Sequence, residues 1–183
     1  YHTACLIGEH FENLHIVNAF LALNAISFVV ERAVELIDMD KSALEIKAIL
    51  EKEIINKNYG GFFVTNNLEY LQRGGRIPQP LSKIGDFLNL KPIIEMNTDK
   101  KGKLSLKEIS RGNKRTIMRI VELLPKDAKK VAVGEIYNKE IKEELIELVK
   151  NKLPNAEISD CTVTPVIASH IGPNCYVLAY SRV

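Results

Sequence analysis

Two short segments of the sequence combine glycine with side chains that could bind an anion. The first, LEYLQRGGRI at residues 68–77, places Gly74 and Gly75 between Arg73 and Arg76. Glycine frees the backbone for a tight turn, and arginine presents a planar fork of donors that suits a carboxylate or a phosphate. The spacing leaves two interpretations open: an anion-binding turn, or the end of a helix flanked by surface arginines.

The second segment is TPVIASHIGPN at residues 164–174, where an apolar stretch leads to His170. The following Gly172 and Pro173 predict a turn that presents the imidazole at the end of a strand or helix. A neutral imidazole offers one donor and one acceptor nitrogen, so it can contact a carboxylate. A structural histidine without a ligand is the alternative.

The other candidates for chemistry do not form a catalytic or metal-binding pattern. His2, His10 and His15 lack the spacing of metal ligands, and the sequence has no P-loop, GxSxG or GxGxxG motif. A hydrolase or phosphotransferase that uses His170 with an arginine lacks a nucleophile, a metal set and a nucleotide loop. We therefore predict no catalytic residue, no metal site and no cofactor.

Composition favours an ordinary cytoplasmic protein. Apolar residues make up 46% of the 183 residues, and 25 basic and 23 acidic residues give a net charge of +2. These charges are mixed along the chain, which argues against nucleic acid as a partner. The odd number of cysteines, without a CxxC pair, indicates reduced thiols. No apolar run reaches the roughly 20 residues that a membrane span needs, so no integral membrane segment is expected.

The positioning elements alternate between helix and strand, as in an α/β fold. A capping box at Ser42 and Glu45 starts one helix, and Asn113 is expected to cap another that runs through Leu124. The predicted helices cover residues 1–12, 25–37, 42–57, 68–73, 113–124 and 139–152. The predicted strands cover residues 14–17, 62–65, 91–96, 103–109, 130–137, 156–163 and 175–180. A polar turn, NTDKKGK, joins two of these strands, and the prolines within residues 77–80 mark the best candidate for a domain boundary.

Three of these segments, in order, resemble signatures of the DegV family. LEYLQRGGRI is similar to that family's "LEYLxRGGRI", and FLNLKPIIEMNTDKKGKLSLKEISRG resembles "LLxIKPIL…DGK…RG". TPVIASHIGP resembles "GPVIGxHTGPG", and YHTACLIGEHFENLHIVNA resembles the helix and strand that follow the family's Ser-Gly-Thr turn. On this resemblance the chain is N-terminally incomplete: the family's first strand, its Thr-Ser loop and its Ser-Gly-Thr turn are absent.

The resemblance implies two α/β domains. Residues 1–72 would be the remainder of an N-terminal DegV domain with a parallel, Rossmann-like sheet that lacks its first elements. Residues 73–183 would form a second α/β domain with a mixed sheet, and a ligand would lie between the two.

The resemblance also implies a function, because members of the family bind one long-chain fatty acid and some present its carboxylate to a fatty acid kinase. The chain would then be a lipid-binding carrier, not an enzyme. The implied lipid-binding residues are His170, Ile171, Gly172, Arg76 and Gly75, and Arg73 and Arg76 would face the partner. His170 would contact the carboxylate.

Several residues depart from the family pattern and support an alternative. Asn18-Ala19 stands where the family has Asp-Ser, and a GH pair near residue 134 is missing. Glycines of the family are replaced by Ala25, Ser27, Asn174 and Val177, and Ile171 replaces a threonine. Side chains in place of bare backbone would narrow a pocket. The alternative is therefore a divergent member that binds another small anion, or an interaction module without lipid.

Overall fold

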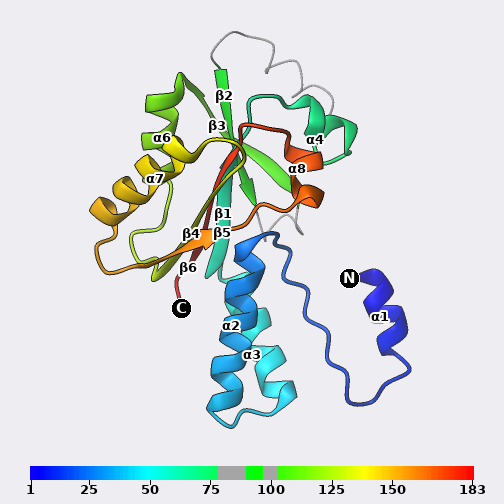
Figure 1. The fold of residues 1–183 in the computed structure, drawn as a ribbon. Helices are drawn as coiled ribbons and strands as arrows, with labels where there is room; N and C mark the ends of the chain where they lie inside the picture. Colours follow the sequence, from blue (N-terminus) through cyan, green and yellow to red (C-terminus); the bar gives the residue numbers. More distant parts are fainter. Residues whose placement is uncertain (78–89, 97–102) are drawn as a thin grey trace.

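A single six-stranded mixed sheet forms the centre of the structure, a computed structural model that describes residues 1–77, 90–96 and 103–183 (Figure 1). The strand order is β3-β2-β1-β6-β4-β5. All neighbours run antiparallel except β4 and β5, which are parallel and joined through α7. The strands are β1 Tyr59–Val64, β2 Leu90–Met96, β3 Leu104–Arg111, β4 Lys130–Glu135, β5 Glu157–Cys161 and β6 Tyr176–Ser181. The predicted α/β fold class is confirmed, and the sheet is mixed.

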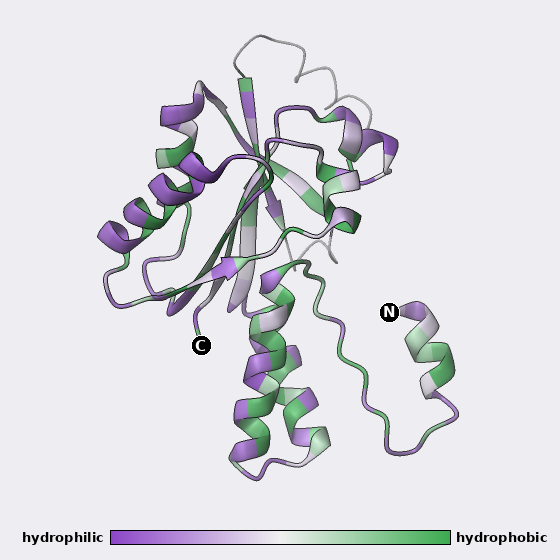
Figure 2. Cartoon of the chain, viewed as in Figure 1, coloured by the Kyte–Doolittle hydropathy of each residue, from purple (hydrophilic) through white to green (hydrophobic). Residues whose placement is uncertain are grey.

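Helices cover both faces of this sheet. They are α1 His2–Gly8, α2 Asn24–Asp38, α3 Ala43–Ile55, α4 Glu69–Arg73, α6 Asn113–Glu122, α7 Lys139–Lys152 and α8 Pro165–Ile171. In Figure 1, α6 and α7 lie on one side, α4 and α8 lie on the other, and the α2–α3 pair extends beyond one end of the sheet. Figure 2 shows α6 and α7 as largely hydrophilic, since only one stripe of each helix meets the sheet.

The alternation of side chains along β1 divides the core. Phe62 and Val64 belong to the cluster under α6 and α7, whereas Phe63 belongs to the cluster under α4 and α8. Tyr59, on the same face as Phe63, packs with α2 and α3. Successive residues of a strand point to opposite faces of the sheet. The side chains of this one buried strand therefore pack against all three groups of helices. The six residues of β1 are all buried, as a central strand requires.

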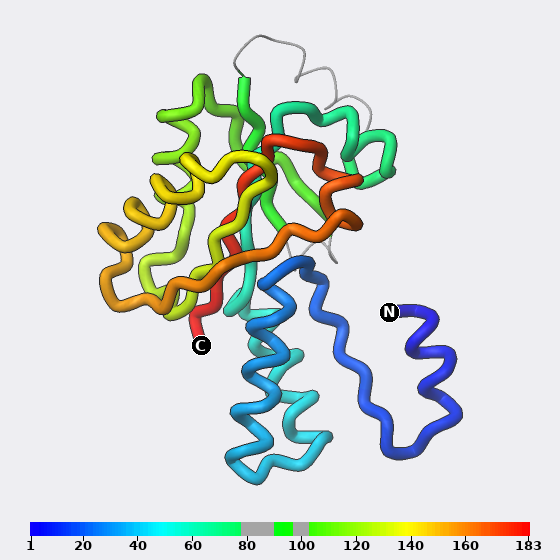
Figure 3. Tube along the Cα trace, viewed as in Figure 1, coloured from blue at the N-terminus to red at the C-terminus, as the bar shows by residue number. Residues whose placement is uncertain are grey.

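Two predicted features of local structure are wrong. Residues 14–17 form no strand, because a strand needs a hydrogen-bonded neighbour and this segment pairs with none of the six described strands. Figure 3 shows that α1 and the chain after it stand apart from the sheet, and α1 buries no residue. Asn113 does not cap α6. It is the first helical residue, and Gly112, at φ +75°, is the N-cap without a side-chain bond.

The capping box of α3 is confirmed. The Oγ atom of Ser42 accepts the backbone N–H of Glu45 at 3.4 Å, and Glu45 Oε2 accepts the N–H of Ser42 at 2.9 Å. The pair satisfies two N–H groups that the first turn of a helix leaves free. These bonds also lower the pKa of Glu45.

The position of the boundary between residues 72 and 73 stays a prediction for the longer protein. Within the described residues β1, which precedes that position, hydrogen bonds with β2 and β6, which follow it. The predicted turn at residues 97–103 and the prolines at residues 78 and 80 lie outside the described residues, apart from residue 103.

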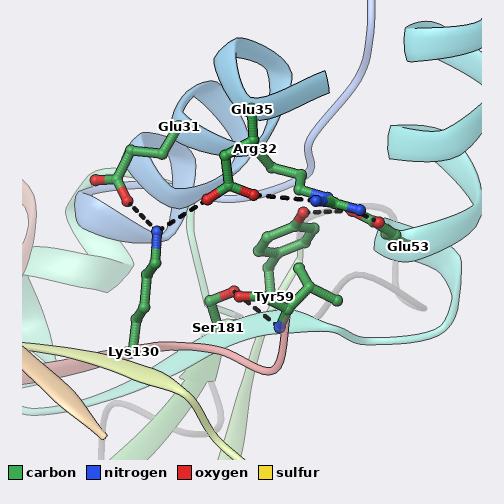
Figure 4. Close-up of polar contacts among 8 residues, drawn as sticks. Glu31, Arg32, Glu35, Glu53, Tyr59, Lys130 and Ser181 are labelled. Carbon is green, nitrogen blue, oxygen red and sulfur yellow. Dashed lines mark hydrogen bonds and ion pairs between the residues drawn. The ribbon is translucent and has the colours of Figure 1, made fainter. Parts of the chain in front are cut away.

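Lys130 connects α2 to the end of the sheet (Figure 4). Its Nζ atom lies 2.9 Å from Glu31 and 3.4 Å from Glu35. The hydrogen bond to Glu31 raises the pKa of Lys130, and the bond from Arg32 lowers the pKa of Glu35. Two elements far apart in the sequence are thereby joined by a charge network.

A second part of the network joins α2 to α3 through a nearly buried carboxylate. Arg32 Nε lies 3.2 Å from Glu53, whose side chain is 12% exposed, and the hydroxyl of Tyr59 donates to Glu53 at 2.5 Å. Burial is the main cause that raises the pKa of Tyr59. The arginine therefore supplies the charge that a carboxylate in this position requires.

Replacing Arg32 with methionine is expected to lower the free energy of unfolding by about 1–3 kcal/mol, because Glu53 is left without its cation. Chemical denaturation would measure the change. The matched control is Arg182→Met, whose pair with Asp127 is more exposed and should cost under about 1 kcal/mol. Equal losses in the two variants would contradict the role given to Glu53.

Candidate functional site

The α4 segment anchors the first glycine–arginine motif through three apolar side chains. Leu68, Leu71 and Ile77 are 1%, 0% and 6% exposed, and they belong to the cluster under α4 and α8. The helix ends at Arg73, and Gly75 then adopts φ +69°, a left-handed conformation that favours glycine. The glycine pair therefore terminates the helix while the anchors fix its position on the sheet.

The α8 segment positions His170 in its last turn. Pro165 is the first helical residue, where its missing N–H costs nothing. Ile171 is buried in the same cluster as Leu71. Gly172 then adopts φ +81° and ψ 178°, a region that is essentially restricted to glycine. The helix ends here for a backbone reason, directly after the histidine.

The structure packs the two motifs against each other. A methyl group at Gly74 would lie 3.0 Å from Nδ1 of His170, and one at Gly172 would lie 2.7 Å from the ring of Tyr70. Each helix thus supplies a glycine that makes room for a ring of the other. The sequence placed His170 and Gly172 in one motif and Gly75 in another, and the fold brings the two motifs into one region.

Two buried side chains, whose roles the sequence did not reveal, fix the end of α8. Thr65, which is fully buried after β1, donates its hydroxyl to the carbonyl of Ile171 at 2.7 Å. The thiol of Cys175 lies 3.0 Å from the same oxygen and 3.1 Å from the carbonyl of Gly172. The position of Thr65 directly after an apolar strand was the only available signal. These bonds satisfy carbonyls that the end of a helix leaves free.

Cys175 is expected to make the stability of the fold depend on pH in the alkaline range. Burial raises the pKa of its thiol to about 11, and burial also raises the pKa values of Tyr59 and Tyr176. The unfolded thiol ionises near pH 9, whereas the folded state keeps its proton. Stability is therefore complete below about pH 8.5 and falls as the pH rises through 11, by roughly 2 kcal/mol for this thiol alone.

Denaturant unfolding measured between pH 8 and pH 11 would test this prediction. Cys175→Ala should unfold with a shallower pH dependence over that range than the unmodified protein, because one titrating group is removed. Identical slopes would show that Cys175 is not the group responsible. The two buried tyrosines remain in both proteins and act as the common background.

The two arginines of the first motif point to the surface. Arg73 pairs with Glu69 at 2.5 Å, and its side chain is 77% exposed. Arg76 is also exposed, and its guanidinium donates to the carbonyl of Gly74. A surface hollow beside them is lined by Glu69, Gln72, Arg73, Gly75 and Ile77. Both cations are available to a partner or a ligand at this surface.

A larger cavity of about 730 Å³ lies at the α3 end of the sheet. Its lining is mainly apolar and consists of Tyr1, His2, Asn18, Phe20, Leu21, Ala22, Glu51, Ile54, Ile55, Met96 and Leu104. Met96 and Leu104 also pack in the cluster that contains Ile171. Asn18, a departure from the family pattern, accepts the N–H of Phe20 at 3.1 Å. One apolar layer thus contacts both the cavity and the end of α8.

The residues that replace family glycines differ in what they occupy. Ala25 and Val177 are fully buried and fill space in the clusters under α2 and α8. Ser27 is exposed. Asn174 is exposed and adopts φ +55°, a conformation that asparagine tolerates better than most residues. Ala25 and Val177 therefore add side-chain atoms to the interior, whereas Ser27 and Asn174 do not.

Among the described residues, no group of three or more His, Cys, Asp or Glu side chains is arranged to hold a metal ion. In the same part of the chain, every helix is too short or too polar to cross a membrane.

Comparison with known proteins assigns the family. The model described as "Uncharacterised protein, DegV family" matches residues 1–182, and this chain belongs to the DegV family. It is 34% identical over 150 residues to Protein DegV of Bacillus subtilis, which covers 79% of this chain and 52% of that protein. The chain spans less than two-thirds of the length of the first curated relatives that it matches.

Solved structures share the fold. A DegV family protein from Thermus thermophilus, described by its fatty acid binding, has a TM-score of 0.78 at 28% identity and covers 98% of this chain and 65% of its own. The fatty acid kinase (Fak) B3 protein of Streptococcus pneumoniae, loaded with linoleic acid, has a TM-score of 0.83 at 17% identity, covering 100% and 64%. The second likeness shows the fold alone.

Proposed function

We propose that the protein binds a long-chain fatty acid and holds its carboxylate at His170. The observation that carries this proposal is the packing of α8 on α4, in which Gly74 lies against His170 and Tyr70 covers Gly172 at the edge of an apolar layer. The relative from Thermus thermophilus is described as binding fatty acid, and the one from Streptococcus pneumoniae carries linoleic acid. The carboxylate needs donors, because a buried charge without them is costly.

The apolar layer provides the affinity. Each methylene that leaves water contributes about 0.8 kcal/mol, so a long acyl chain supplies enough free energy to offset the cost of ordering it. Ile171, as part of this layer, would contact the chain close to the head group. Among the described residues, the cavity that reaches Met96 and Leu104 is the space proposed for the tail.

The other hydrogen-bond donors to the carboxylate would come from the family's Thr-Ser loop and Ser-Gly-Thr turn, to which no residues of this sequence correspond. In the longer protein, residues 1–72 would complete the N-terminal domain and residues 73–183 would form the second domain, with the lipid between them. The protein would work in the cytoplasm as a carrier, not as a catalyst, without a cofactor.

Arg73 and Arg76 are proposed to face a fatty acid kinase. Their exposure leaves both guanidiniums accessible, and exposed cations steer the approach of an acidic partner more than they add to affinity. Such a partner would phosphorylate the carboxylate while the carrier holds it.

A second candidate is a member that binds another small anion, or none. The buried side chains of Ala25 and Val177 favour it, because they occupy space that the family pattern leaves to glycine. Restoring glycine at the buried pair, Ala25 and Val177, would then create lipid binding that the unmodified protein lacks.

Native mass spectrometry and lipid extraction of the purified full-length protein would separate the two candidates. The proposal expects a fatty acid at one molecule per chain, either co-purified or acquired from added linoleic acid. No bound acyl chain under either condition would contradict it and favour the second candidate.

A further inference from the structure

The imidazole of His170 is held by packing and not by hydrogen bonds. Within the described residues no hydrogen bond reaches either ring nitrogen, although the ring is half-buried and its Nδ1 edge faces Gly74. A histidine that positions a ligand usually has its second nitrogen fixed by a hydrogen bond. In this structure the packing of α4 against the imidazole must fix the orientation of the ring.

The backbone N–H groups at the end of α4, next to the ring, are already bonded to carbonyls. The N–H groups of Gly74, Gly75 and Arg76 bond to the carbonyls of Tyr70, Gln72 and Leu71, at distances of 3.0, 2.8 and 2.8 Å. The contact between Gly74 and Nδ1 is therefore van der Waals contact. It depends on the absence of a side chain at residue 74.

The other side of the same interface fixes the backbone on which His170 stands. The ring of Tyr70 covers Gly172, and the carbonyl of Ile171 is bonded to Thr65 and Cys175. These contacts hold the end of α8 in place, so the backbone of α8 cannot shift easily if a side chain at residue 74 presses on the imidazole. A methyl group at Gly74 would also lie 3.3 Å from the carbonyl oxygen of Tyr70, so the imidazole is the part that must yield.

We infer that Gly74 and Tyr70 are positioning residues for His170, and that they turn Nδ1 toward α4 and leave Nε2 as the donor to the ligand's carboxylate. The assignment of the donor rests on the proposed function. The placement of the ring does not, because it follows from contacts within the chain. The two nitrogens lie on different edges of the imidazole. When α4 covers Nδ1, Nε2 therefore faces away from α4.

The first experiment examines the ring in the ligand-free, full-length protein. Long-range ¹H–¹⁵N spectra would follow the ring nitrogens of His170, identified by their loss in His170→Gln. Gly74→Ala should shift these resonances. The control Leu44→Ala should leave them in place, because this side chain is 65% exposed and lies on α3, away from the contact between α4 and α8. Unchanged His170 resonances in Gly74→Ala would overturn the inference.

The second experiment adds linoleic acid. In the unmodified protein, Nε2 should respond more than Nδ1. Gly74→Ala should bind roughly five- to tenfold more weakly, as expected when a bond to a charged group is misaligned, while the control Leu44→Ala stays within about twofold. A larger response at Nδ1 would overturn the choice of donor. Absence of binding in the unmodified protein, with the ring still shifted by Gly74→Ala, would defeat the proposed function and leave the positioning role standing.

Tyr70 provides a test by conservative replacement. Its ring and not its hydroxyl covers Gly172, so Tyr70→Phe should keep the His170 spectrum and the affinity for linoleic acid. Tyr70→Ala should alter both. If Phe and Ala have the same effect at residue 70, the ring is not what positions α8, and this part of the inference fails.

Discussion

Replacing His170 with alanine is expected to weaken the binding of linoleic acid to the full-length protein by roughly 10- to 100-fold. The loss reflects the removal of a donor to a charged carboxylate that burial has separated from water. The free energy of unfolding should change by less than about 1 kcal/mol, because no hydrogen bond joins the imidazole to the described part of the chain. Isothermal titration calorimetry and chemical denaturation would measure the two effects.

The control for this variant is His10→Ala, which removes an exposed imidazole next to α1. His10→Ala should leave affinity unchanged. His170→Gln should retain part of the affinity, since an amide nitrogen can donate to the same carboxylate. If His170→Ala binds linoleic acid as tightly as the unmodified protein does, His170 is a structural histidine and the carboxylate site lies elsewhere.

Gly172→Ala is expected to have the largest effect on stability, a loss of roughly 2–4 kcal/mol. Two causes act together. The backbone at φ +81° and ψ 178° is strained for any residue with a Cβ atom, and that atom would lie 2.7 Å from the ring of Tyr70. Lipid affinity should fall as well, because the turn that follows His170 must rearrange. Denaturant unfolding and linoleic acid titration of the same samples would measure both.

Asn174→Gly is the matched control in the same turn. Its φ of +55° is left-handed too, but asparagine already tolerates this conformation, so glycine should change stability by less than about 1 kcal/mol. If Gly172→Ala lowers the free energy of unfolding as little as Asn174→Gly does, the backbone conformation of Gly172 is not what ends α8.

Local patterns predicted the elements that depend on nearby residues. The spacing of Ile141, Leu145 and Val149 placed a helix at 139–152, and α7 has those bounds. The capping box of α3 was readable for the same reason, since both partners lie within one turn. Residues 14–17 have an apolar strand pattern, but pairing depends on a neighbour far away in the sequence, which the pattern cannot supply.

The candidate site was predictable in part. Glycine, arginine and histidine stood out because each has a chemical or backbone property that ordinary core and surface positions do not need. Tyr70 and Thr65 were missed, since a tyrosine over a glycine and a hydroxyl on a helix carbonyl are contacts between segments roughly 100 residues apart. Cys175 was also missed, although its thiol contacts carbonyls only three and four residues earlier in the chain. The three-dimensional structure of the turn after α8 and of its neighbours shows all three contacts.

The crystal structure of the full-length protein with linoleic acid tests the central claim most directly. The account predicts a carboxylate oxygen within hydrogen-bonding distance of His170 Nε2 and an acyl chain that contacts the apolar layer containing Ile171. Electron density for the lipid at another place, with His170 in contact only with protein, would contradict it.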